Sequence, residues 1–160
     1  MQVDYVRIYD NGFTELAGPA VENEVPVIGA GHSGAWFNAP TPGQGQFIDI
    51  EPQSRFMFLS WFTYTGVDTA QAHEHQWYTA QGNYHGGTAV LDLYETLGGS
   101  FDAPDTVETL KAGTMDINFS DCETAVLSYT LDAEGRSGDI GITRVVSGAG
   151  ALCENLAGLN

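Results

Sequence analysis

The sequence predicts a single all-β domain, an antiparallel meander of about eight strands that forms an up-and-down barrel or a β-sandwich. Twenty glycines and six prolines are spread over 160 residues, so few windows are long enough for a helix of three turns. The segments between these breakers alternate apolar and polar residues with the period of two that is typical of strands. Short links favour antiparallel neighbours, and closure of the sheet would remove its exposed edges.

The alternation places the strands in chain order. Residues 1–10, MQVDYVRIYD, form one strand that ends at a turn, Asn11-Gly12. Residues 11–32 have no sustained period and are expected to be a linker or lead-in to the main body, residues 33–160. Within that body we expect strands at 34–38, 45–51, 55–65, 75–82, 87–96, 106–120, 124–132 and 138–146. The C-terminal tail, AGALCENLAGLN, has no period of its own to anchor it.

The alternation also separates two faces of the sheet. One face is strongly apolar and is expected to form the core; its members are Ile48, Ile50, Met57, Leu59, Trp61, Leu91, Leu93, Met115, Ile117, Phe119, Leu127, Tyr129, Leu131, Ile140 and Ile142. The other mixes aromatic rings with polar groups; its members are Phe47, Asp49, Glu51, Phe56, Phe58, Ser60, Phe62, Tyr64, Gln76, Tyr78, Val90, Asp92, Tyr94, Thr114, Asp116 and Asn118. Strand 55–65 is apolar on both faces, so we expect something to cover it.

The charge balance restricts the possible partners. Five basic residues stand against 21 acidic ones, which gives a net charge of −16, and the basic residues are scattered singly. Such a chain cannot neutralise a nucleic-acid backbone, and its field repels anionic membranes and acidic polysaccharides. We therefore expect a neutral partner, no nucleic acid, no membrane and a monomer. The N-terminus lacks a signal-peptide pattern, and no apolar run could span a bilayer, so we expect a soluble piece of a longer protein.

Two cysteines, Cys122 and Cys153, are widely separated, without the close spacing of a zinc site or a redox pair. A disulfide that ties the C-terminal tail to a turn is the favoured interpretation, and it indicates an oxidising compartment. Two unpaired buried thiols are the alternative.

The first strand carries a family resemblance. Residues 3–9, with Asp4-Tyr5-Val6-Arg7 at their centre, resemble the closing strand of the catalytic domain in family 16 glycoside hydrolases, the laminarinase and agarase type. The resemblance implies that this chain follows such a domain in a secreted bacterial polysaccharidase. The Glu-x-Asp-x-x-Glu signature of that family is absent, because residues 48–52 lack its first glutamate and its spacing, so no catalytic residue is carried over.

The main body resembles a repeat-like β module of secreted bacterial proteins, to which we attach no function. Its opening segment, GAWFN at residues 34–38, is similar to the first strand of avidin-type barrels. That likeness is short and supports the topology alone, since fold does not imply function.

Three tryptophans suggest carbohydrate binding, because the apolar faces of sugar rings stack on planar aromatic side chains. Trp61 shares a face with Met57 and is expected in the core, whereas Trp77 lies in a polar, glycine-bounded stretch and is expected to be exposed. The predicted carbohydrate-binding residues are Trp36, Tyr64, Trp77, Tyr78, Gln81, Asn83, Tyr84 and Asp92. The leading hypothesis is a non-catalytic module that holds a secreted enzyme on a neutral β-glucan such as laminarin.

Other readings predict different chemistry. A structural spacer or protein-interaction module would bury its aromatic residues. A small barrel enzyme would bring together Asp49, Asp92 and Asp116 as acid and base, and the same three could instead surround a calcium ion, although strand carboxylates are more often simply solvated. His73 and His75 could form a metal pair, but two ligands do not make a site, so we expect neither a metal nor a cofactor.

Overall fold

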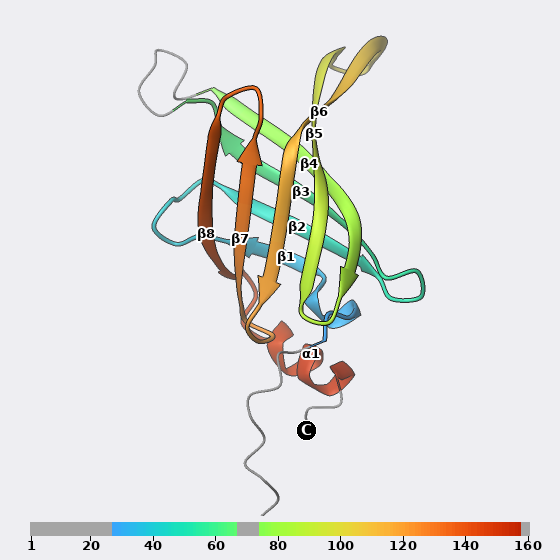
Figure 1. Ribbon diagram of the computed structural model, residues 1–160, viewed down its shortest axis with the longest axis vertical. Helices are drawn as coiled ribbons and strands as arrows, with labels where there is room; N and C mark the ends of the chain where they lie inside the picture. The colour runs from blue at the N-terminus through green and yellow to red at the C-terminus, as the bar shows by residue number, and fades with distance from the viewer. Residues whose placement is uncertain (1–26, 67–73, 158–160) are drawn as a thin grey trace, which may run out of the picture.

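The computed structural model describes residues 27–66 and 74–157, and the strand expected at residues 1–10 lies outside them. Eight antiparallel strands follow one another in chain order, and β1 pairs with β8, so the sheet closes into a barrel (Figure 1). The strands are β1 (Gly34–Phe37), β2 (Gly45–Glu51), β3 (Phe56–Tyr64), β4 (His75–His85), β5 (Thr88–Ser100), β6 (Ala103–Phe119), β7 (Thr124–Leu131) and β8 (Arg136–Arg144). The predicted all-β meander is confirmed, and closure selects the barrel over the sandwich.

The barrel interior contains the apolar face expected from the sequence. All of its predicted members are buried except Tyr129 and Ile140, which pack partly buried against the core. Trp61 is only 4% exposed, as predicted. Tyr78 was expected on the outer face and instead lies inside, because β4 pairs with β3 in the register Trp61↔Tyr78 and Phe62↔Trp77. Neighbouring side chains of a strand point to opposite sides, so an exposed Trp77 requires an inward Tyr78.

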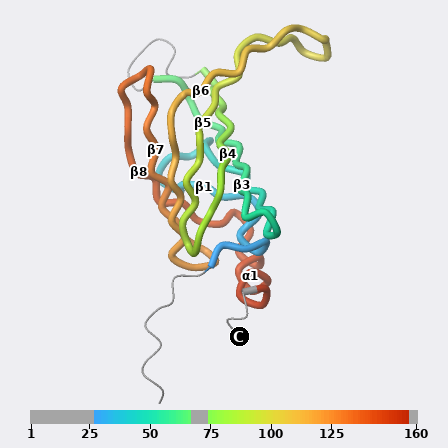
Figure 2. The backbone as a smooth tube through the Cα atoms, turned by 45° about the vertical axis from the view of Figure 1, so that its right-hand side comes forward, coloured from blue at the N-terminus to red at the C-terminus, as the bar shows by residue number. Residues whose placement is uncertain are grey.

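Strands β5 and β6 are longer than predicted and project beyond the barrel as a two-stranded arm (Figure 2). The strand expected at residues 87–96 continues through Gly98 and Gly99, which stay within β5 at φ of 80° and 87°. A register shift lies beside them, and another lies between Leu93 and Tyr94. Glycine tolerates positive φ, so the ladder bends at these positions without ending.

A short 3-10 helix, η1 (Ala30–His32), and helix α1 (Ala149–Ala157) cover one end of the barrel (Figure 1). The C-terminal tail, whose sequence has no period of its own, is thus helical over residues 149–157. Gly31 lies against the backbone of Cys153, where a Cβ would leave no room, so the two helices approach closely. Neither described helix has the length and apolar character that a membrane span requires.

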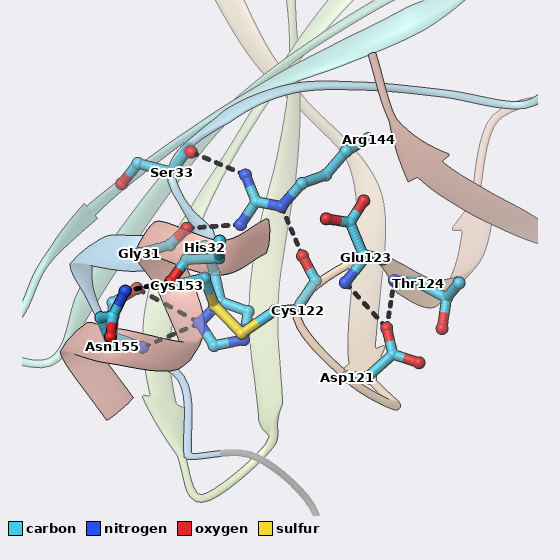
Figure 3. Close-up of a disulfide and its surroundings, with 12 residues drawn as sticks. Gly31, His32, Ser33, Asp121, Cys122, Glu123, Thr124, Arg144, Cys153 and Asn155 are labelled. Carbon is cyan, nitrogen blue, oxygen red and sulfur yellow. Dashed lines mark hydrogen bonds between the residues drawn. A yellow bond between two sulfur atoms is a disulfide. The ribbon is translucent and has the colours of Figure 1, made fainter. Parts of the chain in front are cut away.

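The predicted disulfide is confirmed and joins this end cap to the barrel. Cys122, in the turn between β6 and β7, is bonded to Cys153 of α1, with the two Cα atoms 5.8 Å apart (Figure 3). The Asp121 carboxylate accepts hydrogen bonds from the backbone N–H groups of Glu123 and Thr124 at 2.7 and 2.6 Å, which fixes the turn that presents Cys122.

Arg144, at the end of β8, is buried within the same cap. Its guanidinium donates hydrogen bonds to three backbone carbonyls, those of Cys122, Gly31 and Ser33 (Figure 3). It also lies 4.6 Å from the ring centre of Trp36, in cation–π geometry. One side chain thus connects the lead-in, the β6–β7 turn and the last strand.

His32 is buried beside the disulfide, and its Nδ1 accepts a hydrogen bond from the Gly29 N–H at 3.2 Å. Burial lowers the pKa of His32 below 6.5; the hydrogen bond with Gly29 opposes this shift, the Arg144 charge adds to it, and Asp121 makes the smallest, opposing contribution. The folded protein therefore binds a proton on the His32 ring more weakly than the unfolded chain does, so protonation of His32 favours unfolding.

We expect the His32 contribution to stability to be complete above about pH 6.5 and to disappear as the pH falls through the lowered pKa. Urea unfolding between pH 8 and 5 measures this dependence, and His32→Asn, which does not titrate, serves as the reference. The wild type should lose more stability than the variant between pH 7 and 5. Equal slopes for the two proteins would contradict the prediction.

Candidate functional site

Four aromatic side chains lie on the outer surface of β2, β3 and β4. Phe47, Phe58, Phe62 and Trp77 are 60%, 37%, 48% and 47% exposed, and we call this set the aromatic face. Phe62 and Trp77 are directly opposite each other on β3 and β4, and the Phe47 ring packs edge-on against Phe62 at 6.4 Å. Same-side residues of a strand are about 6.8 Å apart, so Phe58 and Phe62 extend the face over roughly 13 Å.

Polar side chains are interspersed with these rings. The strand registers place Phe58 between Asp49 and Gln81 in one row across the sheet. In the next row, Ser60 lies between Phe47 and Thr79. The aromatic face is thus not a continuous apolar patch, since these two rows also offer hydrogen-bonding groups.

A shallow pocket of about 430 Å³ opens beside Trp77. Its lining residues are Gly43, Phe62, Thr63, His75, Gln76 and Trp77. The pocket is lined by both Phe62 and Trp77, so a ring bound in it could contact the two side chains at once. Gln76 is held in place because its amide donates a hydrogen bond to the Glu95 carboxylate at 2.5 Å.

The structure brings together only some of the predicted carbohydrate-binding residues. Trp77 and Gln81 belong to one outer surface, and Asp92 continues the Gln81 row, although its carboxylate pairs with Lys111 at 2.6 Å. Asn83 is exposed at the far end of β4 and donates weak hydrogen bonds to the Arg55 and Ser54 carbonyls at 3.3 and 3.4 Å.

The others do not contribute to the aromatic face. Trp36 is 1% exposed, and its Nε1–H donates a hydrogen bond to the His32 carbonyl at 3.1 Å, so it is a core residue without a free stacking surface. Tyr84 is also buried. Tyr64 is half-buried, with its ring 5.5 Å from the His75 ring. Trp36 and Tyr84 are buried because their side chains point to the inner side of their strands, whereas Tyr64 has the outward parity of Phe62.

A second cavity, of about 510 Å³, is lined by residues from the end of β3 and from both sides of the β7–β8 turn, and we call it the mouth cavity. Figure 1 shows this turn at the end of the barrel away from α1. Its inner wall is aromatic: the Trp61 ring lies 5.5 Å from Tyr78 and 5.2 Å from Tyr129. The remaining lining residues are Asn38, Thr41, Gln44, Thr63, Tyr64, Gly66, Leu131, Arg136, Asp139 and Ile140. Of these residues, only Tyr64 and Tyr78 belong to the site predicted from the sequence.

The charges of the mouth are mostly neutralised locally. The Tyr78 hydroxyl donates a hydrogen bond to Glu134 at 3.1 Å, and Glu134 forms an ion pair with Arg136 at the same distance. Burial raises the pKa of Tyr78 well above its usual value, and the Glu134 charge adds to the shift, so the phenol stays neutral. The mouth cavity therefore presents aromatic groups and a paired charge at its rim, together with the carboxylate of Asp139.

The three aspartates considered for catalysis do not converge. Asp49 lies on β2 and Asp92 on β5, with two strands between them, which separates their backbones by about 14 Å at the usual strand spacing. Asp116 is on β6, diagonally across from Asp92. All three side chains are exposed on the outside of the barrel.

One cluster has the residue types of a metal site, with His32 beside Cys122 and Cys153. The two sulfur atoms are bonded to each other and so cannot act as thiolate ligands. The other histidine pair considered for a metal includes His73, which lies outside the described residues.

Sequence reasoning placed Phe47, Phe58 and Phe62 on the outer face but did not assign them to a site. The available signal was that strand 55–65 is apolar on both sides, which predicted a covering element. Phe58 and Phe62 remain exposed, so no element in the described part of the chain covers them. Comparison of the chain with protein-family models, with curated proteins and with solved structures gives no match.

Proposed function

We propose that this protein is a non-catalytic carbohydrate-binding module that holds a secreted polysaccharide-degrading enzyme on a neutral β-glucan. The observation that carries the proposal is the aromatic face, where Trp77 and three phenylalanine rings remain exposed on a rigid sheet. Sugar rings present apolar C–H faces that stack on such rings, while their hydroxyl groups require polar partners nearby. Asp49, Gln81, Ser60 and Thr79 lie between the rings and offer those partners.

The charge of the protein favours an uncharged polymer. A net charge of −16 repels uronic and sulfated chains but has little effect on a neutral glucan. The Cys122–Cys153 disulfide is compatible with an oxidising compartment, as expected for a secreted module. The resemblance of residues 3–9 to the end of a family 16 glycoside hydrolase domain suggests the enzyme to which the module is attached. Attachment raises the local substrate concentration, so even weak binding is useful.

Trp77→Ala should weaken β-glucan binding by about 1–3 kcal/mol, the usual effect of removing one stacked aromatic contact, without unfolding the protein. Affinity electrophoresis in gels with laminarin, mixed-linkage glucan, agarose or chitin measures the retardation, and calorimetry gives the affinity. Phe101→Ala is the matched control, because Phe101 is fully exposed at the tip of the β5–β6 arm, away from the aromatic face. This control should migrate like the wild type.

No retardation of the wild type on any of the four polymers would reject the carbohydrate proposal. The aromatic face would then be better explained as a protein-interaction surface, because exposed apolar patches on monomers usually mark contacts with a partner. A Trp77→Ala variant that is retarded as strongly as the wild type would place the sugar elsewhere on the barrel.

A further inference from the structure

We propose that the mouth cavity binds the end of a neutral saccharide chain, as a second site that is separate from the aromatic face. The cavity has a volume of about 510 Å³, within the range of sites that enclose small organic ligands. None of its lining residues belongs to the aromatic face. A chain end in the mouth and a polymer on the outer surface would therefore use different side chains.

A gap in the sheet gives access to the cavity. Strand β1 pairs with only the last two residues of β8, so residues 136–142 of β8 pair with β7 alone. The loop between β1 and β2 lies across this gap, where the Asn38 side-chain amide donates a hydrogen bond to the Gly141 carbonyl at 2.6 Å. Residues of this loop line one side of the cavity, and Asp139 and Ile140 line the other.

The gap also leaves main-chain groups of β8 available. In an antiparallel ladder the N–H and C=O of one residue face the same neighbouring strand, and the side alternates from residue to residue. Gly141 directs its carbonyl towards Asn38, so Asp139, two residues away, directs its own N–H and C=O to the same side. Strand β1 does not extend this far and supplies no ladder partner there. A ligand in the gap thus meets one main-chain donor and one acceptor.

Side chains of the cavity wall keep further hydrogen-bonding groups free. Asp139, Tyr64 and Tyr129 line the cavity, and their carboxylate and hydroxyl groups have no partner within the described ranges. Gln44 accepts a hydrogen bond from the Thr63 hydroxyl through Oε1 at 2.5 Å, which leaves its amide N–H groups to donate. A carboxylate only accepts, an amide nitrogen only donates, and a phenol does both. The wall therefore offers partners of both kinds.

This mixture fits a neutral ring with several hydroxyl groups, because each hydroxyl group both donates and accepts. An apolar ring would bury the free groups of the wall without partners, which is costly. An organic cation would only donate, so the Gln44 N–H groups would lack an acceptor. An anion would be repelled by the net charge of −16. A sugar residue is the ligand class that satisfies all of these conditions.

The floor of the cavity is closed. Trp61, Tyr78 and Leu131 are 4%, 4% and 3% exposed and belong to the packed core. They provide an apolar wall for the C–H groups of a sugar but little free ring surface for stacking. A polymer cannot pass between them into the close-packed barrel. A glycan can therefore enter only with one end, and a free disaccharide should bind in the same way.

Titration with disaccharides that correspond to the four polymers named above tests the proposal. The probes are laminaribiose, cellobiose, neoagarobiose and N,N′-diacetylchitobiose, and choline serves as the cationic probe. The protein is labelled with ¹⁵N and followed by NMR. The backbone amide signal of Ile140, which lines the cavity, should shift to saturation with at least one disaccharide and should not shift with choline.

The same substitution at two tyrosines provides the matched pair. Tyr129→Phe keeps the ring and removes only the hydroxyl group, so the affinity for that disaccharide should fall about three- to tenfold, the usual effect of one hydrogen bond. Tyr94→Phe makes the same change on β5, outside the cavity, and should leave the affinity unchanged. Asp139→Ala should lower the affinity about tenfold, because hydrogen bonds to a charged group are stronger. Asp139 is exposed, so this variant should fold.

Three results would overturn the proposal. The first is the absence of a saturable Ile140 shift with all four disaccharides. The second is saturation by choline and by no sugar, which would assign the cavity to an organic cation. The third is a wild-type affinity in both Tyr129→Phe and Asp139→Ala.

The outcome can be told apart from that of the proposal for the aromatic face. Trp77→Ala should weaken the retardation by a polymer but leave the Ile140 titration with a disaccharide unchanged. Retardation without a disaccharide site would reject the mouth alone, and a disaccharide site without retardation would reject the aromatic face alone.

Discussion

Arg144→Met should lower the free energy of unfolding by about 3–5 kcal/mol, because three carbonyls lose their donor and each unsatisfied buried group costs roughly 1–3 kcal/mol. The long apolar stem is kept, so the change removes the guanidinium rather than the packing. The backbone carbonyls of Gly31, Ser33 and Cys122 would lose their shared donor inside the end cap. Buried carbonyls without partners are costly, and the cation–π contact with Trp36 is lost as well.

Urea unfolding monitored by circular dichroism measures this effect. Arg144→Lys keeps the charge but lacks the planar guanidinium that reaches three acceptors, so it should recover only part of the lost stability. Lys111→Met is the surface control, because Lys111 forms an exposed ion pair with Asp92. The stability of this variant should stay close to that of the wild type. An Arg144→Met variant as stable as Lys111→Met would show that the guanidinium does not hold the cap together.

Loss of the disulfide is the second large effect that we expect. Replacement of both Cys122 and Cys153 by serine should destabilise the protein by about 3–4 kcal/mol, the chain-entropy value for a loop of this length. The two residues are 31 positions apart, and the bond joins α1 to the β6–β7 turn. Leu152 and Leu156 of α1 are exposed, so the helix has few apolar contacts with which to replace the bond.

Limited proteolysis followed by intact mass measures the consequence. The double serine variant should be cleaved within residues 149–157, while the barrel core and the affinity for β-glucan survive. Leu152→Ser, an exposed position on the same helix, serves as the control and should resist cleavage like the wild type. Rapid alkylation of two thiols in the native wild-type protein would contradict the existence of the bond.

The sequence alone determined the features that depend on neighbouring residues. Apolar and polar side chains must alternate wherever one side of a strand is buried, so the eight strands and most of the core could be predicted from this period, although Trp36, Tyr78 and Tyr84 were not expected in it. The disulfide could be predicted because only Cys122 and Cys153 were available to pair. Trp77 was expected to be exposed from its polar surroundings, and the structure places it on the outside of β4.

Tertiary structure decided the features that depend on contacts between distant residues. Arg144 looks like any of the five scattered basic residues until the β6–β7 turn and the lead-in bring three carbonyls to it. The sequence of the C-terminal helix shows no clear apolar period, because contact with η1 and the disulfide, rather than a continuous apolar stripe, hold the helix against the barrel.

The mouth cavity also follows from closure of the barrel. Its volume is the space that inward side chains from strands far apart in sequence fail to fill, and local alternation fixes only the direction of each side chain. Tyr78 lies beside Trp61 through the β3–β4 register, whereas Tyr129 of β7 meets Trp61 only once β1 pairs with β8. Periodicity along one strand defines its two faces. Which residues surround a common space depends on the register and curvature of the whole sheet, so the pairing of all eight strands determines it.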